Sequence, residues 1–273
     1  MNFYIELYSI IFTIMKELNR IYNEDCLVGM QDIEDKSIDM ICCDLPYGVL
    51  NKNNKSSKWD EIIPFDKLWE QYKRIIKDNG VIVLFGQGMF SARLMSSNPE
   101  MWRYNLIWEK DRPTGFLNSN RMPLRSHEDI MVFYKNLGTY NPQMEYAPDK
   151  KNHARGNGSH KITNRCYGEM TEPEDCISDY KFPRSVIKIK KEHKCVGNEH
   201  PTQKPVELIE YLIKTYSNKG DVILDNCIGS GTTAVACINT ERNFIGFEIT
   251  EQYFNLANQR IRDALNDINS KLW

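Results

Sequence analysis

The sequence predicts an α/β fold: a doubly wound, mostly parallel sheet with helices on both faces. Three observations support this prediction. After residue 15, short apolar runs of strand length alternate with amphipathic stretches of helix length. Several runs are apolar at almost every position, as in strands that are covered on both faces of a sheet. Two of them end in a carboxylate, Asp44 and Asp225, and ligands of α/β sheets bind at the carboxyl ends of strands.

The composition is that of a globular protein. The chain has 273 residues, of which 41% are hydrophobic and 26% charged, and this excludes a disordered chain, a collagen and a coiled coil. The net charge of -2 gives no overall basic excess that would indicate a polyanion partner. Eight cysteines without a C-x-x-C pair, several of them inside apolar runs, predict reduced core thiols and a cytoplasmic protein.

The N-terminal segment has two interpretations. Residues 3–15 are apolar but too short to span a membrane, and they lack the basic start and the cleavage site of a signal peptide. Residues 1–14 are either an extension upstream of the true start at Met15 or an extra helix that packs on the domain. Neither interpretation predicts a membrane protein.

The elements of the first half follow from periodicity. Ile38–Asp44 predicts a buried strand that a carboxylate closes. Helical spacing over Phe65–Lys77 predicts a helix, with Asn79-Gly80 as its C-terminal cap. The remaining apolar runs predict three more strands: Val81–Phe85, Tyr104–Trp108 and Ile130–Tyr134.

From residue 139 the periodicity fades, and it returns only near residue 200. Charges in this stretch fall in blocks, basic over 150–168 and 181–194 and acidic over 169–180. We interpret residues 139–199 as an insert with two basic faces. Beyond it the pattern predicts three helices and two strands, in chain order Pro205–Ser217, Val222–Asp225, Thr232–Asn239, Phe244–Glu248 and Glu251–Ile268.

The first segment whose residues could take part in a reaction is Asp44-Leu45-Pro46-Tyr47-Gly48, at the end of a predicted strand. The Asp44 carboxylate and the Pro46 carbonyl are acceptors, and the Tyr47 ring offers a stacking face. This set suits a planar base that carries an exocyclic amine. A β-turn capped by aspartate has the same pattern, so this segment alone does not decide between the two.

The second segment is Asp225–Thr233, in which a strand leads through Gly229 and Gly231 into a helix. Glycines let the backbone approach a ligand closely, and the helix start offers unpaired N–H groups. No lysine follows as in a phosphate-binding loop, so a ligand without phosphates is favoured. Glu248 ends the next strand, where a carboxylate typically binds the hydroxyls of a ribose. Lys204, before a predicted helix, is a candidate for binding an amino-acid carboxylate or is a surface lysine.

Together these segments resemble the S-adenosylmethionine-dependent amino-methyltransferases of DNA, in their circularly permuted beta order. Asp44–Gly48 resembles the catalytic D-P-P-Y motif, with Leu45 in place of the first proline. Asp225–Thr233 resembles the glycine-rich cofactor motif, although Cys227 replaces the frequent phenylalanine. His200–Pro205 resembles the H-P-T-Q-K-P segment, and Asn23–Leu27 the G-D-x-L element. The resemblance spans roughly Arg20 to Arg262.

The resemblance implies a Rossmann-like methyltransferase domain with its catalytic half at 15–138, a target-recognition insert at 139–199 and its cofactor half at 200–273. It implies Asp44, Pro46 and Tyr47 as catalytic residues, S-adenosyl-L-methionine as cofactor, double-stranded DNA as substrate, and no metal. The implied cofactor-binding residues are Asp25, Lys204, Asp225, Gly229, Gly231, Thr232 and Glu248. Whether the enzyme is a homodimer and whether a cognate restriction enzyme accompanies it are left open.

The resemblance favours methylation of adenine N6. Enzymes of this kind that act on cytosine N4 mostly begin the motif with serine, whereas this chain has Asp44, so the N4 reaction is the alternative. Methylation of cytosine C5 needs a nucleophilic Pro-Cys, and none of the 11 prolines precedes a cysteine. An inactive DNA-binding relative is a further alternative. A zinc module is not expected, because its possible ligands fit no usual zinc spacing: Cys166, Cys176, His193 and Cys195.

Overall fold

The computed structural model describes residues 16–49, 60–147, 152–153, 163–164, 168–169, 177–191 and 203–271. The predictions for residues 1–14, for the four zinc candidates and for His200 lie outside these ranges. Within them, no helix has the length and apolar character that crossing a membrane requires.

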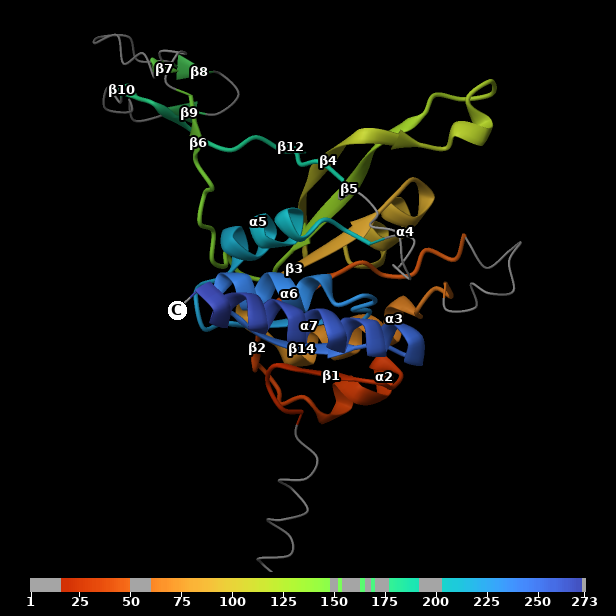
Figure 1. The fold of residues 1–273 in the computed structure, drawn as a ribbon. Coiled ribbons are helices and arrows are strands. Elements are labelled where there is room, and N and C mark those ends of the chain that lie inside the picture. The colour runs from red at the N-terminus through yellow and green to blue at the C-terminus, as the bar shows by residue number, and fades with distance from the viewer. Residues whose placement is uncertain are drawn as a thin grey trace, which may run out of the picture. The chain divides into compact units, whose positions relative to one another are not determined.

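An eight-stranded sheet forms the main unit of the chain (Figure 1), in the spatial order β1-β14-β13-β2-β3-β5-β4-β12. Neighbouring strands of this sheet pair in parallel except where β5 lies between β3 and β4, to both of which it is antiparallel. The strands are β1 (Arg20–Tyr22), β2 (Ile38–Cys43), β3 (Ile76–Gly86), β4 (Trp102–Thr114), β5 (Arg125–Phe133), β12 (Val186–Lys188), β13 (Val222–Asp225) and β14 (Asn243–Phe247). The predicted mostly parallel sheet is confirmed.

Helices cover both faces of this sheet. The helices α2 (Cys26–Gly29), α3 (Phe65–Ile75) and α4 (Met89–Ser97), with the short 3-10 helix η1 (Met30–Asp32), pack on one face. On the other face lie α5 (Val206–Tyr216), α6 (Thr232–Thr240) and α7 (Glu251–Lys271), which Figure 1 draws in blue shades. Strand β2 shows why both faces must be covered: Met40 and Cys42 belong to one core, and Ile41 and Cys43 to the other.

The segment at Asn79-Gly80 differs from the prediction. Helix α3 ends at Ile75, and strand β3 begins immediately at Ile76, so these two residues lie inside the strand rather than in a helix cap. A Cβ atom at Gly80 would come within 2.9 Å of the Asp39 carbonyl oxygen and 2.7 Å of the Ile76 side chain. The glycine is therefore explained by close approach to β2, where the pairing register shifts between Ile38 and Met40.

In the main unit, strands β3, β4 and β5 are longer than predicted, and the helices α2 and α4 and the strands β1 and β12 were not predicted. β4 and β5 were predicted only over their apolar parts, whereas each continues through polar residues as an antiparallel ribbon that ends at Thr114 and Arg125. Cross-strand hydrogen bonds hold a strand beyond its apolar stretch, and periodicity alone does not reveal them. Helix α4 has a weak apolar periodicity, since Met89 is 70% exposed and Ser91 is buried, and it was not predicted. Pro205 lies at the N-cap of α5 rather than in its first turn.

Pro142–Arg184 forms a second unit of the chain. Its short antiparallel pairs join β6 (Glu145–Tyr146) to β11 (Tyr180–Lys181), β7 (Asn152–His153) to β10 (Ile177–Ser178), and β8 (Thr163–Asn164) to β9 (Gly168–Glu169). The predicted insert 139–199 is longer than this unit. Its residues from Ser185 onward belong to the main unit, where β12 pairs with β4 and Lys188 forms an ion pair with Glu109 at 3.1 Å.

Candidate active site

A cavity of about 790 Å³ opens in the main unit beyond the carboxyl ends of β2, β13 and β14. The segments after these strands bring Asp44, Asp225 and Glu248 to its wall, although they lie far apart in the sequence. The carboxyl ends of parallel strands meet at one edge of a sheet, which explains the convergence. Nine of the ten predicted site residues line this cavity, and the tenth, Gly231, lies in the turn between β13 and α6.

The turn after β13 is held by Asp225. Its Oδ2 accepts a hydrogen bond from the Thr233 hydroxyl at 2.6 Å, and its Oδ1 accepts one from the Cys227 backbone N–H at 3.1 Å. Burial raises the pKa of Asp225 to about 6, and these hydrogen bonds oppose the rise. Gly231 has a φ of 82° and lies so close to α7 that a Cβ atom would be 2.9 Å from the Ala257 Cβ. Asp225 and Gly231 therefore shape the loop that approaches the ligand.

Glu248 points a carboxylate with spare acceptor capacity at the cavity. It is 8% exposed, and each oxygen already accepts one backbone hydrogen bond, from Gly229 at 2.9 Å and from Thr250 at 2.8 Å. Each oxygen keeps a further lone pair. Burial raises the pKa of Glu248, and the two N–H groups counteract this. Asp25, exposed at the cavity edge, caps α2 through a 2.7 Å hydrogen bond from the Leu27 N–H.

The loop after β2 presents Asp44, Pro46 and Tyr47 to the same cavity. Leu45 is 3% exposed and packs in the core, so it anchors the loop to the core. The Tyr47 hydroxyl donates to Asp44 Oδ1 at 2.7 Å. The Tyr47 ring lies against Phe90 with centroids 4.6 Å apart. Two of the loop's predicted functional groups, the Asp44 carboxylate and the Tyr47 ring, are therefore held in fixed relation to each other.

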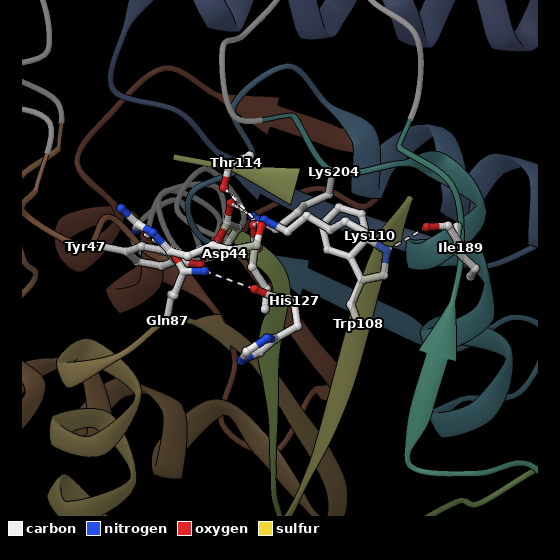
Figure 2. Close-up of polar contacts among 11 residues, drawn as sticks. Asp44, Tyr47, Gln87, Trp108, Lys110, Thr114, His127, Ile189 and Lys204 are labelled. Carbon is white, nitrogen blue, oxygen red and sulfur yellow. Dashed lines mark hydrogen bonds and ion pairs between the residues drawn. The ribbon is translucent and has the colours of Figure 1, made fainter. Parts of the chain in front are cut away.

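A buried network of charges surrounds Asp44 (Figure 2). The Lys204 ammonium contacts the Asp44 carboxylate and lies 3.2 Å from Glu128 Oε2, while Lys110 pairs with Glu128 Oε1 at 2.5 Å. Lys204 and Lys110 are 8% and 7% exposed. The Phe85 ring lies 5.0 Å from the Lys204 nitrogen. Such a network stays charged only because each ammonium has a carboxylate partner.

Burial and neighbouring charges act in opposite directions on the pKa values of this network. Burial raises the pKa of Asp44, and the Lys204 ammonium opposes the rise. Burial lowers the pKa of Lys204, but the carboxylates of Asp44 and Glu128 outweigh it and hold this pKa above its ordinary value. Burial raises the pKa of Glu128, but the Lys204 and Lys110 ammonium groups outweigh this effect and hold the pKa of Glu128 below its ordinary value. Lys204 and Glu128 are therefore charged at neutral pH.

Glu128 and Lys110 line the cavity but are not among the predicted site residues. A period of two is the signal that could have found Lys110, because it lies two residues beyond the buried Trp108 and shares its face of β4. The Trp108 indole donates to the Ile189 carbonyl at 2.8 Å and forms the adjoining wall.

Metal binding has no support in the described residues. No group of three or more histidine, cysteine, aspartate or glutamate side chains is placed there to hold an ion. The cysteines described are all free thiols: Cys26, Cys42, Cys43, Cys227 and Cys237.

Comparisons with known proteins place this geometry in a family. The sequence model of the N6/N4 DNA methylases matches residues 38–259. The chain is 29% identical to the Type II methyltransferase M1.MboII of Moraxella bovis, over 89% of this chain and 96% of that protein. It is 26% identical to the Type II methyltransferase M.HpaI of Haemophilus parainfluenzae, over 92% of this chain and 76% of that protein.

Solved structures share the fold. The M1.HpyAVI–SAM complex superposes with a TM-score of 0.59 at 24% identity, covering 89% of this chain and 98% of that one. The PvuII DNA methyltransferase, which is cytosine-N4-specific, superposes with a TM-score of 0.64 at 14% identity, covering 93% of both chains. Since the family model matches well over half of the sequence, the chain belongs to the N6/N4 family of DNA methylases.

Proposed function

We propose that the protein transfers a methyl group from S-adenosyl-L-methionine to the exocyclic N6 amine of adenine in double-stranded DNA. The observation that carries the proposal is the position of the Asp44 carboxylate. It stands at a strand end, beside an acceptor carbonyl and an aromatic ring, in the cavity that also holds Glu248 and the glycine turn. Relatives of this chain are Type II methyltransferases, which supports a DNA substrate.

The residues of the cavity fit this cofactor. Glu248 offers free lone pairs to ribose hydroxyls, and Gly229 and Gly231 give close access to the backbone. The described glycine turn, residues 225–233, contains no lysine of the kind that follows the glycines of a phosphate-binding loop, which agrees with a nucleoside carrying a sulfonium instead. The volume of about 790 Å³ accommodates a cofactor together with a nucleobase, since ligand pockets measure about 300–1,000 Å³.

The bound cofactor supplies a sulfonium methyl group that an amine nitrogen can attack in line. The protein's part is to prepare that amine. The Asp44 carboxylate and the Pro46 carbonyl each accept a hydrogen bond from the amine, which favours a pyramidal nitrogen with an available lone pair. The Tyr47 ring stacks on a base that has been flipped out of the duplex. As the nitrogen gains a carbon, it must lose a proton, and the Asp44 carboxylate is the nearest acceptor.

The contacts of Lys204 with two carboxylates suggest that it acts on the ionisation of Asp44. The sequence motif indicated a carboxylate of the cofactor as its partner, whereas its ammonium lies on Asp44 and Glu128. We propose that Lys204 keeps Asp44 ionised until the base arrives. Glu128 Oε2 already lies 3.2 Å from the Lys204 nitrogen, so it can hold the ammonium when Asp44 turns toward the amine.

The Lys204→Met variant tests this role. Asp44 must be ionised to accept a hydrogen bond from the amine. Removing the Lys204 ammonium raises the pKa of Asp44 further. The acid limb of the pH profile of kcat should therefore move to higher pH, with little change in KM for the cofactor. If KM for the cofactor rises strongly while the acid limb stays in place, Lys204 binds the cofactor carboxylate instead.

The Glu248→Ala variant tests the cofactor site. Losing charge-assisted hydrogen bonds to a ribose should cost about 1.5–3 kcal/mol of binding, or roughly 10- to 150-fold in affinity. Isothermal calorimetry with S-adenosylmethionine measures this directly. Glu251→Ala, a change to an exposed residue outside the cavity lining, serves as the control with unchanged affinity. Parent-like affinity of Glu248→Ala would count against the assigned ribose site.

The reaction itself is tested with S-adenosylmethionine labelled in its methyl group. Incubation with duplex DNA, followed by digestion to nucleosides and chromatography, should place the label in N6-methyladenine. Label in N4-methylcytosine would assign the alternative reaction of this family. Absence of label from every DNA tested would indicate an inactive DNA-binding relative.

A further inference from the structure

The turn between β4 and β5 exposes large apolar side chains. Its 3-10 helix η3 (Phe116–Asn118) carries Phe116, which is 78% exposed, and Leu117, which is 98% exposed and is the most exposed large apolar residue of the described chain. Met122 and Leu124 in the same turn are 51% and 37% exposed. Exposed apolar groups that gather in one place usually mark a binding surface.

The turn is built to present these side chains. Gly115 adopts a φ of 90°, and backbone hydrogen bonds close the turn, from Asn118 to Gly115 at 2.9 Å and from Ser119 to Phe116 at 3.0 Å. A further bond joins the Met122 N–H to the Asn118 carbonyl at 3.0 Å. Figure 1 draws the β4–β5 ribbon extending past β3, with this turn at its free end. The backbone thus holds its shape without burying Phe116 or Leu117.

Positive charge surrounds the apolar tip. From Arg112 to His127 the chain carries three arginines and no carboxylate, and Arg112, Arg121 and Arg125 are all exposed. The exposed Asp111 directly precedes this segment, and its carboxylate accepts a hydrogen bond from the Lys191 backbone N–H at 2.8 Å. An apolar tip with three exposed arginines in the same turn is complementary to duplex DNA, in which phosphates flank stacked bases. A protein partner would need the apolar surface but not the three arginines.

The tip adjoins the catalytic cavity. Thr114, Gly115 and Arg125, at the root of the turn, line the same cavity as Asp44. A base that leaves the duplex for this cavity leaves a gap in the stack, and unstacking and unpairing it costs a few kcal/mol. Apolar side chains that enter such a gap offset this cost.

Resting on the proposed function, we propose that Phe116 and Leu117 are a wedge. They enter the duplex beside the target and fill the space that the flipped base vacates, while the arginines of the turn contact the flanking phosphates. The partner of this surface is therefore duplex DNA at the methylation site.

The test compares two duplexes, after sequencing of DNA methylated by the parent protein has identified its target site. One duplex is fully paired, and the other carries a mismatch opposite the target base, which removes most of the cost of flipping. The double variant Phe116→Ser/Leu117→Ser should lose about 10- to 100-fold in kcat/KM on the paired duplex and less than about 3-fold on the mismatched one. Leu137→Ser is the matched control: Leu137 is 79% exposed, lies beyond the other end of β5 and does not line the cavity.

A fluorescent base reports flipping without chemistry. With 2-aminopurine at the target position, the parent protein should raise the fluorescence, and the double variant should not. Equal losses on both duplexes, or no loss on either, would overturn the wedge while the proposed function stands. If the parent protein methylates neither duplex nor any other DNA, the proposed function fails, and the wedge fails with it.

Discussion

Replacing Asp44 with alanine is expected to lower the rate of methyl transfer by on the order of 10³-fold while cofactor affinity stays within about 3-fold of the parent. The carboxylate gains its strongest interaction only as the amine becomes pyramidal, so its loss affects the transition state more than binding. Single-turnover rates and calorimetry measure the two quantities separately.

The variant Asp44→Asn separates shape from charge. It keeps one acceptor oxygen and nearly the same volume, and should retain more activity than Asp44→Ala but far less than the parent. Lys204 keeps Glu128 as a partner in both variants, so both should fold, and thermal melts check this. Turnover of Asp44→Ala within about 3-fold of the parent would show that Asp44 only caps the turn after β2.

The second large effect is on stability. Glu128→Ala should lower the free energy of unfolding by roughly 3–5 kcal/mol, because it removes the carboxylate shared by two buried ammonium groups. Lys110 would lose its ion-pair partner at 2.5 Å, and Lys204 would keep only Asp44. Equilibrium unfolding in urea provides the measurement.

Two further variants show whether the effect comes from unpaired charge. In Glu128→Ala/Lys110→Met no ammonium is left without a partner, so the double variant should be more stable than Glu128→Ala alone. Glu109→Ala breaks the exposed ion pair between Glu109 of β4 and Lys188 of β12, and it should leave the unfolding midpoint almost unchanged. Equal destabilisation by the Glu128 and Glu109 changes would contradict the account of the network.

The sequence predicted those parts of the site that follow from local patterns. Asp44, Asp225 and Glu248 were expected at one edge of the sheet because each follows an apolar run, and parallel strands bring their carboxyl ends together. The glycine turn was found because Gly229 and Gly231 separate a strand from a helix. Both features need only a few consecutive residues and one rule of topology. The fold class was confirmed for the same reason.

Features that depend on pairing between distant segments were not predictable. The Lys110–Glu128 ion pair requires β4 and β5 to run antiparallel with Trp108 opposite Glu128, and no local pattern states that register. The position of Gly80 inside β3 depends on the approach of the Asp39 carbonyl from β2. The contact of Lys204 with Asp44 joins residues 160 positions apart in the sequence. Of these, only the helix cap predicted at Asn79-Gly80 was wrong, because a single segment does not show which distant backbone approaches it.

The most direct test of the central claim is the nucleoside content of DNA in a bacterial host that lacks DNA methyltransferases of its own. The host expresses either the parent protein or Asp44→Ala, and its DNA is digested and analysed by mass spectrometry. The account predicts N6-methyladenine with the parent protein and none above background with Asp44→Ala. N4-methylcytosine in its place, or N6-methyladenine at equal levels with both proteins, would contradict the account.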